Sequence, residues 1–496
     1  MKITASHLYN YNACPHRVWR DAHDNPNLRD DPNEFVQLLW EKGTQYEKQV
    51  LEGMKGDRII LDLSVVPKEE RAQATLNAIE NKVPLIYHGR LEVDDLLGEP
   101  DLLELQPSGE YVAIDIKSGM GVAGGDDFEE GKLKKHYALQ LALYTDALRR
   151  LGFATHYLGK IYDSTGQLVD YALDQPKGVK AKETWWEFYE EALMYVGNIL
   201  KNAIHTKAAL GSICKLCVWY TDCKKTCIED DYLSLIPELG RAKQDALESI
   251  ATTVRKLADL DPADYIDAKG KVDIPGVGKA TLEKFNRRAK LIADDVKEVQ
   301  ILEAFTLPER PIELYFDIET DPTQDVVYLH GVVERRMNDP EKTQFHAFLS
   351  KGVSKADERL AWEEFWNYIR SLPDAFSVYY YSKYERTQFR ALREKHPSVV
   401  SEEELEHFFD NEASIDLYEY VKKYTEWPTY NYSVKTLAQF LGFKWRDSNP
   451  SGAASIQWFN EWCKDQVPDK MQRILDYNED DCVAMLVLKD ELMKHI

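Results

Sequence analysis

The chain has 496 residues, of which 44% are hydrophobic, and its 85 acidic and 62 basic residues give a formal net charge of -23. A chain of this length can bury more than one core, so two or three domains are expected. The negative charge excludes a protein that coats nucleic acid or anionic membranes non-specifically. No run approaches the ~18 apolar residues of a spanning helix, and the N-terminus lacks a signal-peptide pattern, so we expect no membrane span and a cytoplasmic location.

Hydrophobic periodicity divides the chain into three stretches. Residues 1–230 mix helical and strand-like spacing, residues 231–305 are almost wholly helical, and residues 306–496 alternate strands with helices. The expected fold class is therefore a multidomain α/β protein with three domains at these boundaries. The helical stretch contains a repeat at an offset of 38 residues, in which Ile236–Ala242 is echoed by Ile274–Ala280.

The seven cysteines are unevenly distributed. Their odd number in a long chain argues against a disulfide framework. Cys214, Cys217, Cys223 and Cys227 lie within 14 residues, whereas Cys14 stands far upstream. Clustered cysteines in a reducing compartment indicate a metal site.

Residues 96–119 are expected to form a β-hairpin that carries charged side chains, with its turn at 107–109. In the second strand Asp115 and Lys117 share one face, and Asp101 precedes them on the first strand. Two carboxylates can hold Mg²⁺ or Mn²⁺, while the lysine orients water or stabilises charge on a phosphorane. The alternative is a surface strand with an ordinary Asp–Lys pair.

Two helical segments add further polar residues. Glu47 follows Gly43 on one, and Gln140 and Tyr144 share a face of the other at i, i+4. With Gly98–Asp101 and Asp115–Lys117, they resemble the RecB-type branch of the PD-(D/E)xK nuclease superfamily, although many relatives have histidine where Glu47 stands. The resemblance implies a restriction-endonuclease-like domain with metal ligands Glu47, Asp101 and Asp115, the catalytic lysine Lys117, and the site-supporting residues Gln140 and Tyr144.

The cysteine spacing fits the same resemblance. Cys214, Cys217 and Cys223 have the form C-x2-C-x5-C, and together with Cys14 they resemble the iron–sulfur RecB-like nucleases. This resemblance implies a structural [4Fe–4S] cluster on those four thiolates, which joins the two ends of the domain. The alternative is a local zinc site on the downstream cysteines, Cys227 included.

A positive segment lies in the helical stretch. Gly276 and Gly278 precede Lys279, so backbone N–H groups can face an anion at the start of a helix. The segment resembles a helix-hairpin-helix, a sequence-independent DNA-binding element. The resemblance implies that the DNA backbone is contacted by Gly276, Gly278, Lys279, Arg287 and Arg288. The alternative is a helical linker with a tight turn.

Two details of this segment limit its function. The upstream copy of the repeat has Glu238 in place of the first glycine, so that copy is expected to pack only. A phosphate-binding P-loop is excluded because Asp273 stands where its upstream glycine is required and Ala280 follows Lys279. We therefore expect no ATP binding and no helicase activity.

A second acidic constellation lies in the last third of the chain. Asp317 and Glu319 interrupt an apolar strand at i and i+2, so both face one side, which is costly unless they are paired or bound to metal. Far downstream, Tyr477 and Asp481 share one helix face at i, i+4.

This order of residues resembles the tyrosine subtype of the DEDD exonucleases, which have a ribonuclease-H-like fold. The resemblance implies two divalent metals on Asp317, Glu319 and Asp481, with Tyr477 positioning the attacking water. The family's second acid is usually aspartate, whereas this chain offers Glu385. The alternative is an inactive module retained for binding.

Three neighbouring features have secondary roles in this interpretation. Asp416 is a second candidate for the missing acid. Asp480 is expected to be solvated, and residues 433–437 are expected to serve in packing or strand contact.

Together these motifs resemble RecB-like nucleases in which an iron–sulfur PD-(D/E)xK domain is fused through a helix-hairpin-helix region to a ribonuclease-H-like exonuclease module. The function expected is a Mg²⁺- or Mn²⁺-dependent nuclease acting on DNA, either single-stranded or at duplex ends. The alternatives are a non-catalytic or singly active iron–sulfur DNA-binding scaffold and an RNA-processing nuclease.

Overall fold

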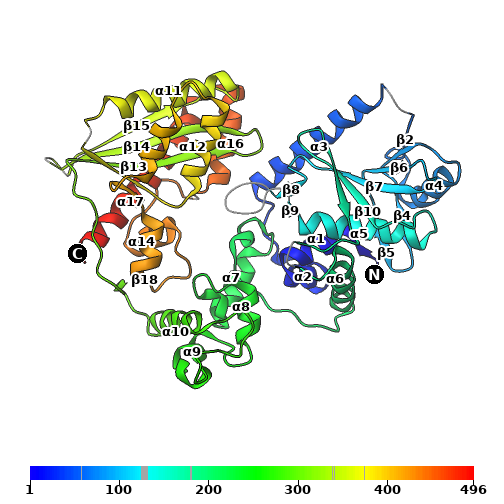
Figure 1. The fold of residues 1–496 in the computed structure, drawn as a ribbon, viewed down its shortest axis with the longest axis horizontal. Coiled ribbons are helices and arrows are strands. Elements are labelled where there is room, and N and C mark those ends of the chain that lie inside the picture. The colour runs from blue at the N-terminus through cyan, green and yellow to red at the C-terminus, as the bar shows by residue number, and fades with distance from the viewer. Residues whose placement is uncertain are drawn as a thin grey trace. The chain divides into compact units, whose positions relative to one another are not determined.

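The computed structural model describes residues 1–56, 59–123, 132–178, 181–337, 339, 341–373, 375–448 and 450–495. The chain divides into two compact units, and Figure 1 labels many of their helices and strands. The first unit comprises residues 1–32, 36–208 and 213–222, and the second comprises residues 33–35, 209–212 and 223–496. The helical stretch and the C-terminal stretch therefore belong to the same unit.

The first unit is built on a six-stranded mixed sheet with strand order β11-β10-β7-β6-β3-β2. Strands β6 and β7 are antiparallel, and β7 and β10 are parallel. A smaller sheet has the order β1-β5-β4, and β8 pairs with β9. The strands are β1 (Ile3–Thr4), β2 (Ile60–Asp62), β3 (Leu85–Tyr87), β4 (Leu91–Val93), β5 (Leu96–Gly98), β6 (Leu102–Leu105), β7 (Tyr111–Ile116), β8 (Val122–Ala123), β9 (Lys132–Leu133), β10 (Leu158–Tyr162) and β11 (Leu168–Ala172).

Helices cover this sheet on both faces. Ala113 of β7 packs in a core with Leu141 of α5, whereas Ile114 packs in another core with Val50 and Leu51 of α3. The predicted hairpin is confirmed, and Gly109 in its turn has a φ of +89°, which favours glycine. The helices are α1 (Ala5–Ala13), α2 (Pro15–His23), η1 (Pro26–Leu28), α3 (Glu34–Met54), α4 (Lys68–Glu80), α5 (Lys135–Arg150), α6 (Trp185–Leu200) and η2 (Ser212–Leu216).

The helical stretch of the second unit forms the same turn at both copies of the repeat. The Leu239 N–H donates to the Ile236 carbonyl at 3.2 Å, and the Val277 N–H donates to the Ile274 carbonyl at 3.1 Å. Gly276 has a φ of +70° in the second turn. The helices here are α7 (Tyr220–Glu229), η3 (Leu233–Leu235), α8 (Gly240–Leu247), α9 (Val254–Asp259), η4 (Pro262–Tyr265) and α10 (Lys279–Ala293).

The rest of the second unit contains a five-stranded sheet with strand order β15-β14-β13-β16-β17. Strands β13, β14 and β15 are antiparallel, whereas β13, β16 and β17 are parallel. A short ladder pairs β12 with β18. The strands are β12 (Gln300–Ile301), β13 (Ile312–Asp321), β14 (Val326–Arg336), β15 (Thr343–Leu349), β16 (Phe376–Tyr380), β17 (Ser414–Asp416) and β18 (Thr425–Glu426).

Both faces of this sheet are covered by helices. Phe316 packs with Trp362 and Phe365 of α11 on one face, and Tyr315 packs in the core that contains Leu488 of α17 on the other. None of the described helices is both long and apolar enough to span a membrane. The helices are α11 (Lys355–Ser371), α12 (Tyr384–Lys395), α13 (Glu402–Asp410), α14 (Leu417–Tyr424), α15 (Val434–Phe440), α16 (Gly452–Asp465) and α17 (Pro468–Met493).

Candidate active sites

The first candidate site lies at the edge formed by β3, β6 and α3. One ligand atom each from Glu47, His88 and Asp101 lies within 4.8 Å of the others. His88 directly follows β3 and Asp101 directly precedes β6, and the His88 N–H donates to the Asp101 carbonyl at 2.9 Å. The antiparallel pairing of these strands therefore places the two residues side by side.

Glu47 is held by two donors. Its Oε1 lies 2.7 Å from His88 Nε2 and accepts a hydrogen bond from the Tyr87 hydroxyl at 2.8 Å. Burial would raise the pKa of Glu47, but the hydrogen bonds from His88 and Tyr87 outweigh burial, so the pKa lies below its ordinary value. The carboxylate is therefore ionised and can act as a ligand for a hard cation.

Asp115 is paired with the lysine two residues further on. Lys117 Nζ lies 2.9 Å from Asp115 Oδ2, and Asp115 is only 1% exposed. The alternative of a surface Asp–Lys pair is therefore wrong, because both faces of β7 are buried. Burial would lower the pKa of Lys117, but the charges of Asp115 and Asp101 outweigh it and raise that pKa, so the lysine is a cation.

Asp101 connects the lysine pair to the group of three. Its Oδ2 accepts a hydrogen bond from the Ile116 N–H at 2.7 Å, and its own N–H donates to Asp115 Oδ1 at 3.5 Å. Burial, with the nearby charge of Asp115, raises the pKa of Asp101 well above its ordinary value. A divalent cation would offset this concentration of negative charge, so the donor set fits Mg²⁺ or Mn²⁺.

Gln140 and Tyr144 lie on α5 beside the segment that leads to Asp101. Gln140 Nε2 donates to the Tyr144 hydroxyl at 3.2 Å, and that hydroxyl donates to the Glu99 carbonyl at 3.4 Å. A Cβ on Gly98 would come within 2.7 Å of the Tyr144 ring, so this close approach requires glycine. Both residues therefore lie where they can support the strand before Asp101.

His88 is the residue of this site that the sequence analysis missed. Its φ of +55° is unusual for a residue other than glycine and costs about 1–3 kcal/mol, a strain that is typical of functional sites. A polar residue between an apolar strand and Gly89 was the available sequence signal. Its partners Glu47 and Asp101 come from other elements, so their proximity was not visible in the local pattern.

His88→Ala is expected to weaken Mn²⁺ binding at the first site by about 10- to 100-fold, because the substitution removes both a candidate ligand and a partner of Glu47. The affinity is measured by following free Mn²⁺ in a titration of an Asp317→Asn background, so that the second site does not contribute. Tyr87→Phe removes only the hydroxyl that donates to Glu47 and should have a smaller effect. An unchanged affinity for His88→Ala would place His88 outside the site.

The second candidate site lies where α17 crosses β13. Carboxylate oxygens of Asp317, Glu319 and Asp481 lie within 4.8 Å of one another, and all three residues are at least half-buried. Asp317 and Glu319 share a face of β13 because they are two residues apart. The local spacing in strand and helix thus brings together the three ligands that the sequence analysis named.

Asn478 fixes α17 to the strands beneath it. Its Nδ2 donates to Asp317 Oδ2 at 2.9 Å. Gly331 lies opposite Asp317 on β14, and a Cβ there would lie only 1.6 Å from Asn478 Oδ1. Glycine is therefore required at position 331 for this approach of helix and strand.

Tyr477 lies between a lysine and a carboxylate. Lys435 Nζ donates to the Tyr477 hydroxyl at 2.5 Å and lies 3.9 Å from Asp481 Oδ2. Trp445 Nε1 donates to Asp481 Oδ1 at 2.8 Å. Burial and the neighbouring carboxylates raise the pKa of Tyr477 well above its ordinary value, so the hydroxyl is neutral. Residues 433–437 were expected to serve in packing or strand contact, and the structure places Lys435 of this segment against Tyr477 and Asp481.

The carboxylates of this cluster hold protons unusually tightly. Burial, together with the charge of Asp481, raises the pKa of Glu319 to about 8. Burial and the charges of Asp481, Glu319 and Glu385 raise the pKa of Asp317 well above its ordinary value. The charge of Lys435 lowers the pKa values of Asp317 and Glu319, but it does not bring them back to their ordinary range. One or more divalent cations would supply the missing positive charge, so the donor set fits such cations.

Glu385 lies near this cluster but outside the group of three. It is on α12, 4% exposed, and its Oε2 has no hydrogen-bond partner within the described part of the chain. Burial raises its pKa well above the ordinary value, and its charge in turn raises the pKa of Asp317. A buried carboxylate oxygen without a partner fits a further cation.

The two other acidic candidates have structural partners. Asp416 Oδ1 accepts hydrogen bonds at 2.9 Å from the backbone N–H groups of Ser382 and Tyr418, so it caps α14. Asp480 is 6% exposed and accepts from the Arg446 side chain at 2.9 Å. The expectation of a solvated Asp480 is therefore wrong, because Arg446 covers it.

In the absence of divalent cations, the free energy of unfolding should fall as pH rises from about 4.5 to about 8, the ordinary and the folded-state pKa of Glu319. Within this window the folded protein holds a proton that the unfolded chain has released, so the slope reaches about -1.4 kcal/mol per pH unit for one proton. Denaturant unfolding at several pH values measures it. Glu319→Gln should flatten the dependence, and an equal slope in that variant would contradict the assignment.

Some of the residues expected to contact a nucleic-acid backbone are exposed to solvent, whereas Arg288 is buried. Gly276, Gly278 and Lys279 are exposed at the start of α10, where Gly278 is the N-cap. Arg287 is 42% exposed and lies 3.2 Å from Glu426. Arg288 is 1% exposed and bound to carboxylates, so it is not available to phosphate, and the expected contact is wrong for this residue because of its burial.

Three of the four predicted cluster cysteines lie in the first unit. Cys14 joins α1 to α2, and the Cys217 N–H donates to the Cys214 carbonyl at 3.0 Å. Burial raises the pKa of Cys217, Arg17 lowers it, and the nearby Cys14 raises it further. Cys223 lies in the second unit, on α7.

The described structure does not choose between the iron–sulfur cluster and the local zinc site. Among the residues that the structure describes, no three cysteine sulfurs of either set lie within 4.8 Å of one another. Cys227 is buried, and its sulfur accepts a hydrogen bond from Ser234 Oγ at 3.9 Å.

The two acidic clusters each lie in an α/β domain that is built on a mixed sheet. They are features of a nuclease-type hydrolase, a class that acts on nucleic acids. Family comparison supports this class for both halves of the chain. Residues 13–224 match the model of the PD-(D/E)XK nuclease superfamily, and residues 314–493 match that of the RNase_H superfamily. Searches of curated proteins and of solved structures returned no significant match.

Proposed function

We propose that the protein is a Mg²⁺- or Mn²⁺-dependent DNA exonuclease with two active sites. The observation that carries this proposal is the cluster of Asp317, Glu319 and Asp481, whose oxygens lie within 4.8 Å of one another beside Tyr477 and Lys435. Such a constellation fits in-line hydrolysis of a phosphodiester bond.

At the C-terminal site, Asp317, Glu319 and Asp481 would hold divalent cations, which would supply Lewis-acid polarisation of the scissile phosphate. The neutral Tyr477 hydroxyl, which accepts from Lys435, orients the attacking water through its oxygen. Asp481 is fixed by Trp445, so its carboxylate does not rotate away. The ammonium of Lys435 offsets negative charge as it develops on the phosphoryl oxygens, and burial strengthens this interaction.

At the N-terminal site, Glu47, His88 and Asp101 would hold a cation with Asp115 as a further ligand, and Asp115 also orients Lys117. Lys117 is the donor that can stabilise the pentavalent phosphorus or hold the attacking water, because its ammonium is charged and its side chain is only 22% exposed. Gln140 and Tyr144 hold the segment at Glu99 that leads to Asp101. This site would also hydrolyse phosphodiester bonds of DNA, as the second site would.

The start of α10 is the proposed contact to the DNA backbone. Exposed backbone at Gly276 and Gly278 leads into a helix N-terminus, which favours phosphate, and Lys279 adds a cation that is 56% exposed. Arg287 extends this positive surface. The resemblance to a helix-hairpin-helix favours DNA over RNA as the polymer.

We also propose the [4Fe–4S] cluster on Cys14, Cys214, Cys217 and Cys223, as the sequence resemblance implies. The helix that directly follows Cys14 contacts the segment that follows Cys217, since Trp219 Nε1 donates to Asp21 Oδ1 at 2.9 Å and Arg20 lies 2.5 Å from Asp222, and this supports the cluster. Protein purified without oxygen should be brown and contain iron, and Cys14→Ala should lose both properties. Colourless protein with stoichiometric zinc that Cys14→Ala leaves unchanged would favour the local zinc site.

The substrate is tested with end-labelled single-stranded DNA, duplex DNA and RNA, each with Mg²⁺, Mn²⁺ or a chelator. We expect stepwise shortening of DNA that the chelator abolishes, with RNA left intact. Shortening of RNA alone would instead indicate an RNA-processing nuclease. Binding of DNA without cleavage by metal-loaded protein would indicate a scaffold.

The position of Glu385 favours a second candidate function, an enzyme in which only the N-terminal site is active. Its oxygens lie outside the 4.8 Å group, so a second cation at the C-terminal site would be bound more loosely than in an enzyme with aspartate there. Activity that depends on Asp115 but not on Asp317 would support this reading.

A further inference from the structure

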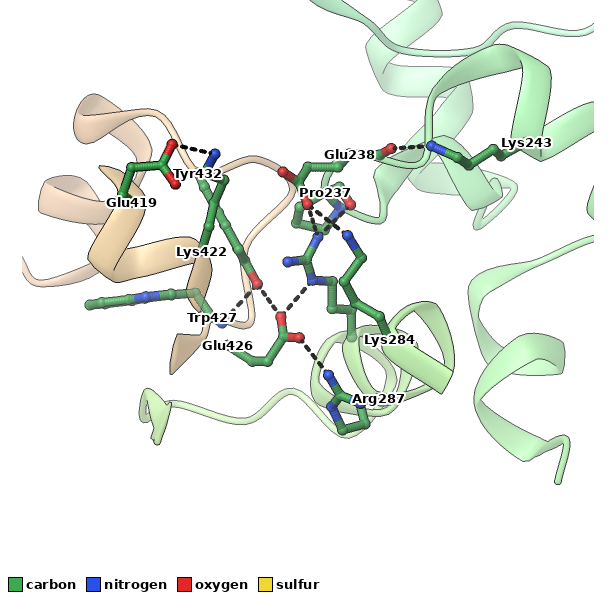
Figure 2. A network of polar contacts seen from close by, with 11 residues as sticks. Pro237, Glu238, Lys243, Lys284, Arg287, Glu419, Lys422, Glu426, Trp427 and Tyr432 are labelled. Carbon is green, nitrogen blue, oxygen red and sulfur yellow. Dashed lines mark hydrogen bonds and ion pairs between the residues drawn. The ribbon is translucent and has the colours of Figure 1, made fainter. Parts of the chain in front are cut away.

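Figure 2 shows a polar network between α10 and the segment that follows α14, with Glu238, Glu426 and Tyr432 labelled. The buried Arg288 is the centre of this network. Its Nε donates to Glu426 Oε2 at 2.5 Å, and its Nη1 donates to Glu238 Oε2 at 2.8 Å and to the Pro237 carbonyl at 2.9 Å. Arg288 and Glu426 are each 1% exposed. This network joins the helical stretch to β18 and the loop that follows it, within one compact unit.

Glu238 adopts an unusual backbone conformation in this network. Its φ of +64° nearly matches the +70° of Gly276 at the equivalent position of the repeat, although glutamate is disfavoured there. Its carboxylate accepts from Arg288 and also from Lys284 at 3.1 Å (Figure 2). The upstream copy of the repeat therefore serves to bind α10.

Tyr432 is the next member of the network. Its ring centre lies 4.6 Å from the Arg288 guanidinium, and its hydroxyl donates to Glu426 Oε2 at 2.6 Å. The same hydroxyl accepts from the Trp427 N–H at 3.1 Å, and the Tyr432 carbonyl accepts from the Tyr381 hydroxyl. Tyr432, the last residue of the loop 427–432, thus also holds the first residue of that loop through its hydroxyl.

Tyr432 directly precedes the helix that carries the active-site lysine. Ser433 is the N-cap of α15, with its Oγ accepting from the Thr436 N–H at 3.3 Å, and Lys435 lies in the first turn. A displacement of Tyr432 would therefore move the start of α15 and with it the contact of Lys435 with Tyr477. The contacts run without interruption from α10 to the second site.

We propose that Arg288 and Tyr432 are positioning residues of the C-terminal nuclease site and that they act through Lys435. This inference rests on the proposed function of that site. The helical stretch would then help to hold the C-terminal active site in shape. The exposed start of α10 would hold substrate, while the buried face of the same helix holds Lys435 in place.

The first test does not require turnover. Acylation of Lys435 by acetic anhydride, followed by mass spectrometry, reports how well the ammonium is held by Tyr477 and Asp481. Tyr432→Phe should accelerate acylation of Lys435 by about 5-fold, the equivalent of one lost hydrogen bond, and Arg288→Met should do so at least as strongly. Tyr430→Phe is the matched control, because Tyr430 lies on the same loop and is 39% exposed.

The second test uses turnover of end-labelled DNA. Tyr432→Phe should lower the Asp317-dependent kcat by about 5-fold with KM unchanged, and it should leave the Asp115-dependent activity unchanged. In a Lys435→Met background, the same substitution should have no further effect, because its influence passes through the lysine.

Three results would overturn the inference: equal acylation of Lys435 in wild type and Tyr432→Phe, an undiminished effect of Tyr432→Phe in the Lys435→Met background, or an equal loss of activity at both sites. Absence of Asp317-dependent turnover in the wild type would refute the proposed function instead. The acylation rates would still decide whether the network positions Lys435.

Discussion

Replacing Asp317 by asparagine is expected to abolish hydrolysis at the C-terminal site, with a loss in kcat of about 10³-fold or more. Asparagine keeps the size of the side chain but removes the charge that would bind a divalent cation. It also leaves the Asn478 amide facing another amide. Turnover of end-labelled DNA in an Asp115→Asn background measures the loss without contribution from the first site.

The same substitution should raise the melting temperature of the cation-free protein by a few degrees. Burial and three neighbouring carboxylates raise the pKa of Asp317, so near neutral pH folding must place a proton on a side chain that is ionised in the unfolded chain, and asparagine, which is already neutral, removes this cost. Asp469→Asn, at an exposed position of α17, is the control and should leave both kcat and the melting temperature nearly unchanged. A drop in activity together with a drop in stability would indicate damage to the fold instead.

Gly331→Ala is expected to lower the C-terminal activity by about 100-fold, because the new Cβ would lie 1.6 Å from Asn478 Oδ1 and must displace α17 or the amide. The displacement moves Asn478 away from Asp317 and shifts Tyr477 and Asp481 on the same helix. The overpacking should also cost about 1–3 kcal/mol of unfolding free energy.

The control for this substitution is Gly452→Ala, since a Cβ at Gly452 would meet no atom within 4 Å. Denaturant unfolding and the rate of DNA shortening give the two effects. Wild-type activity in Gly331→Ala would mean that the helix and the strand do not approach as closely as the contact of Gly331 and Asn478 requires.

Local periodicity was sufficient to predict much of the fold and part of the second site. The alternation of Asp317 and Glu319 on a strand and the helical spacing of Tyr477 and Asp481 follow from the geometry of one element each. The hairpin around Gly109 was visible for the same reason. These features depend on residues that are close in sequence.

The residues that were missed depend on contacts between distant elements. His88 meets Glu47 across 41 residues, and Lys435 meets Tyr477 across 42. Lys435 did leave one signal, because a lysine in the first turn of a helix opposes the helix dipole and therefore calls for a partner elsewhere.

Arg288 shows how charge alone misleads. It was grouped with exposed basic residues because the segment is positive, yet it follows the buried Phe285 by three positions on the inner face of α10. The helical period was the signal that could have separated it from Lys279. The partner Glu426, which comes from another element, could not be read from the local sequence.

The most direct test of a two-site, metal-dependent nuclease compares DNA hydrolysis by the wild type with that by the double variant Asp115→Asn, Asp317→Asn. We expect the wild type to shorten end-labelled DNA only with Mg²⁺ or Mn²⁺, each single variant to retain part of that activity, and the folded double variant to have none. Full activity in the double variant, or no cleavage by the folded, metal-loaded wild type, would contradict the proposed function.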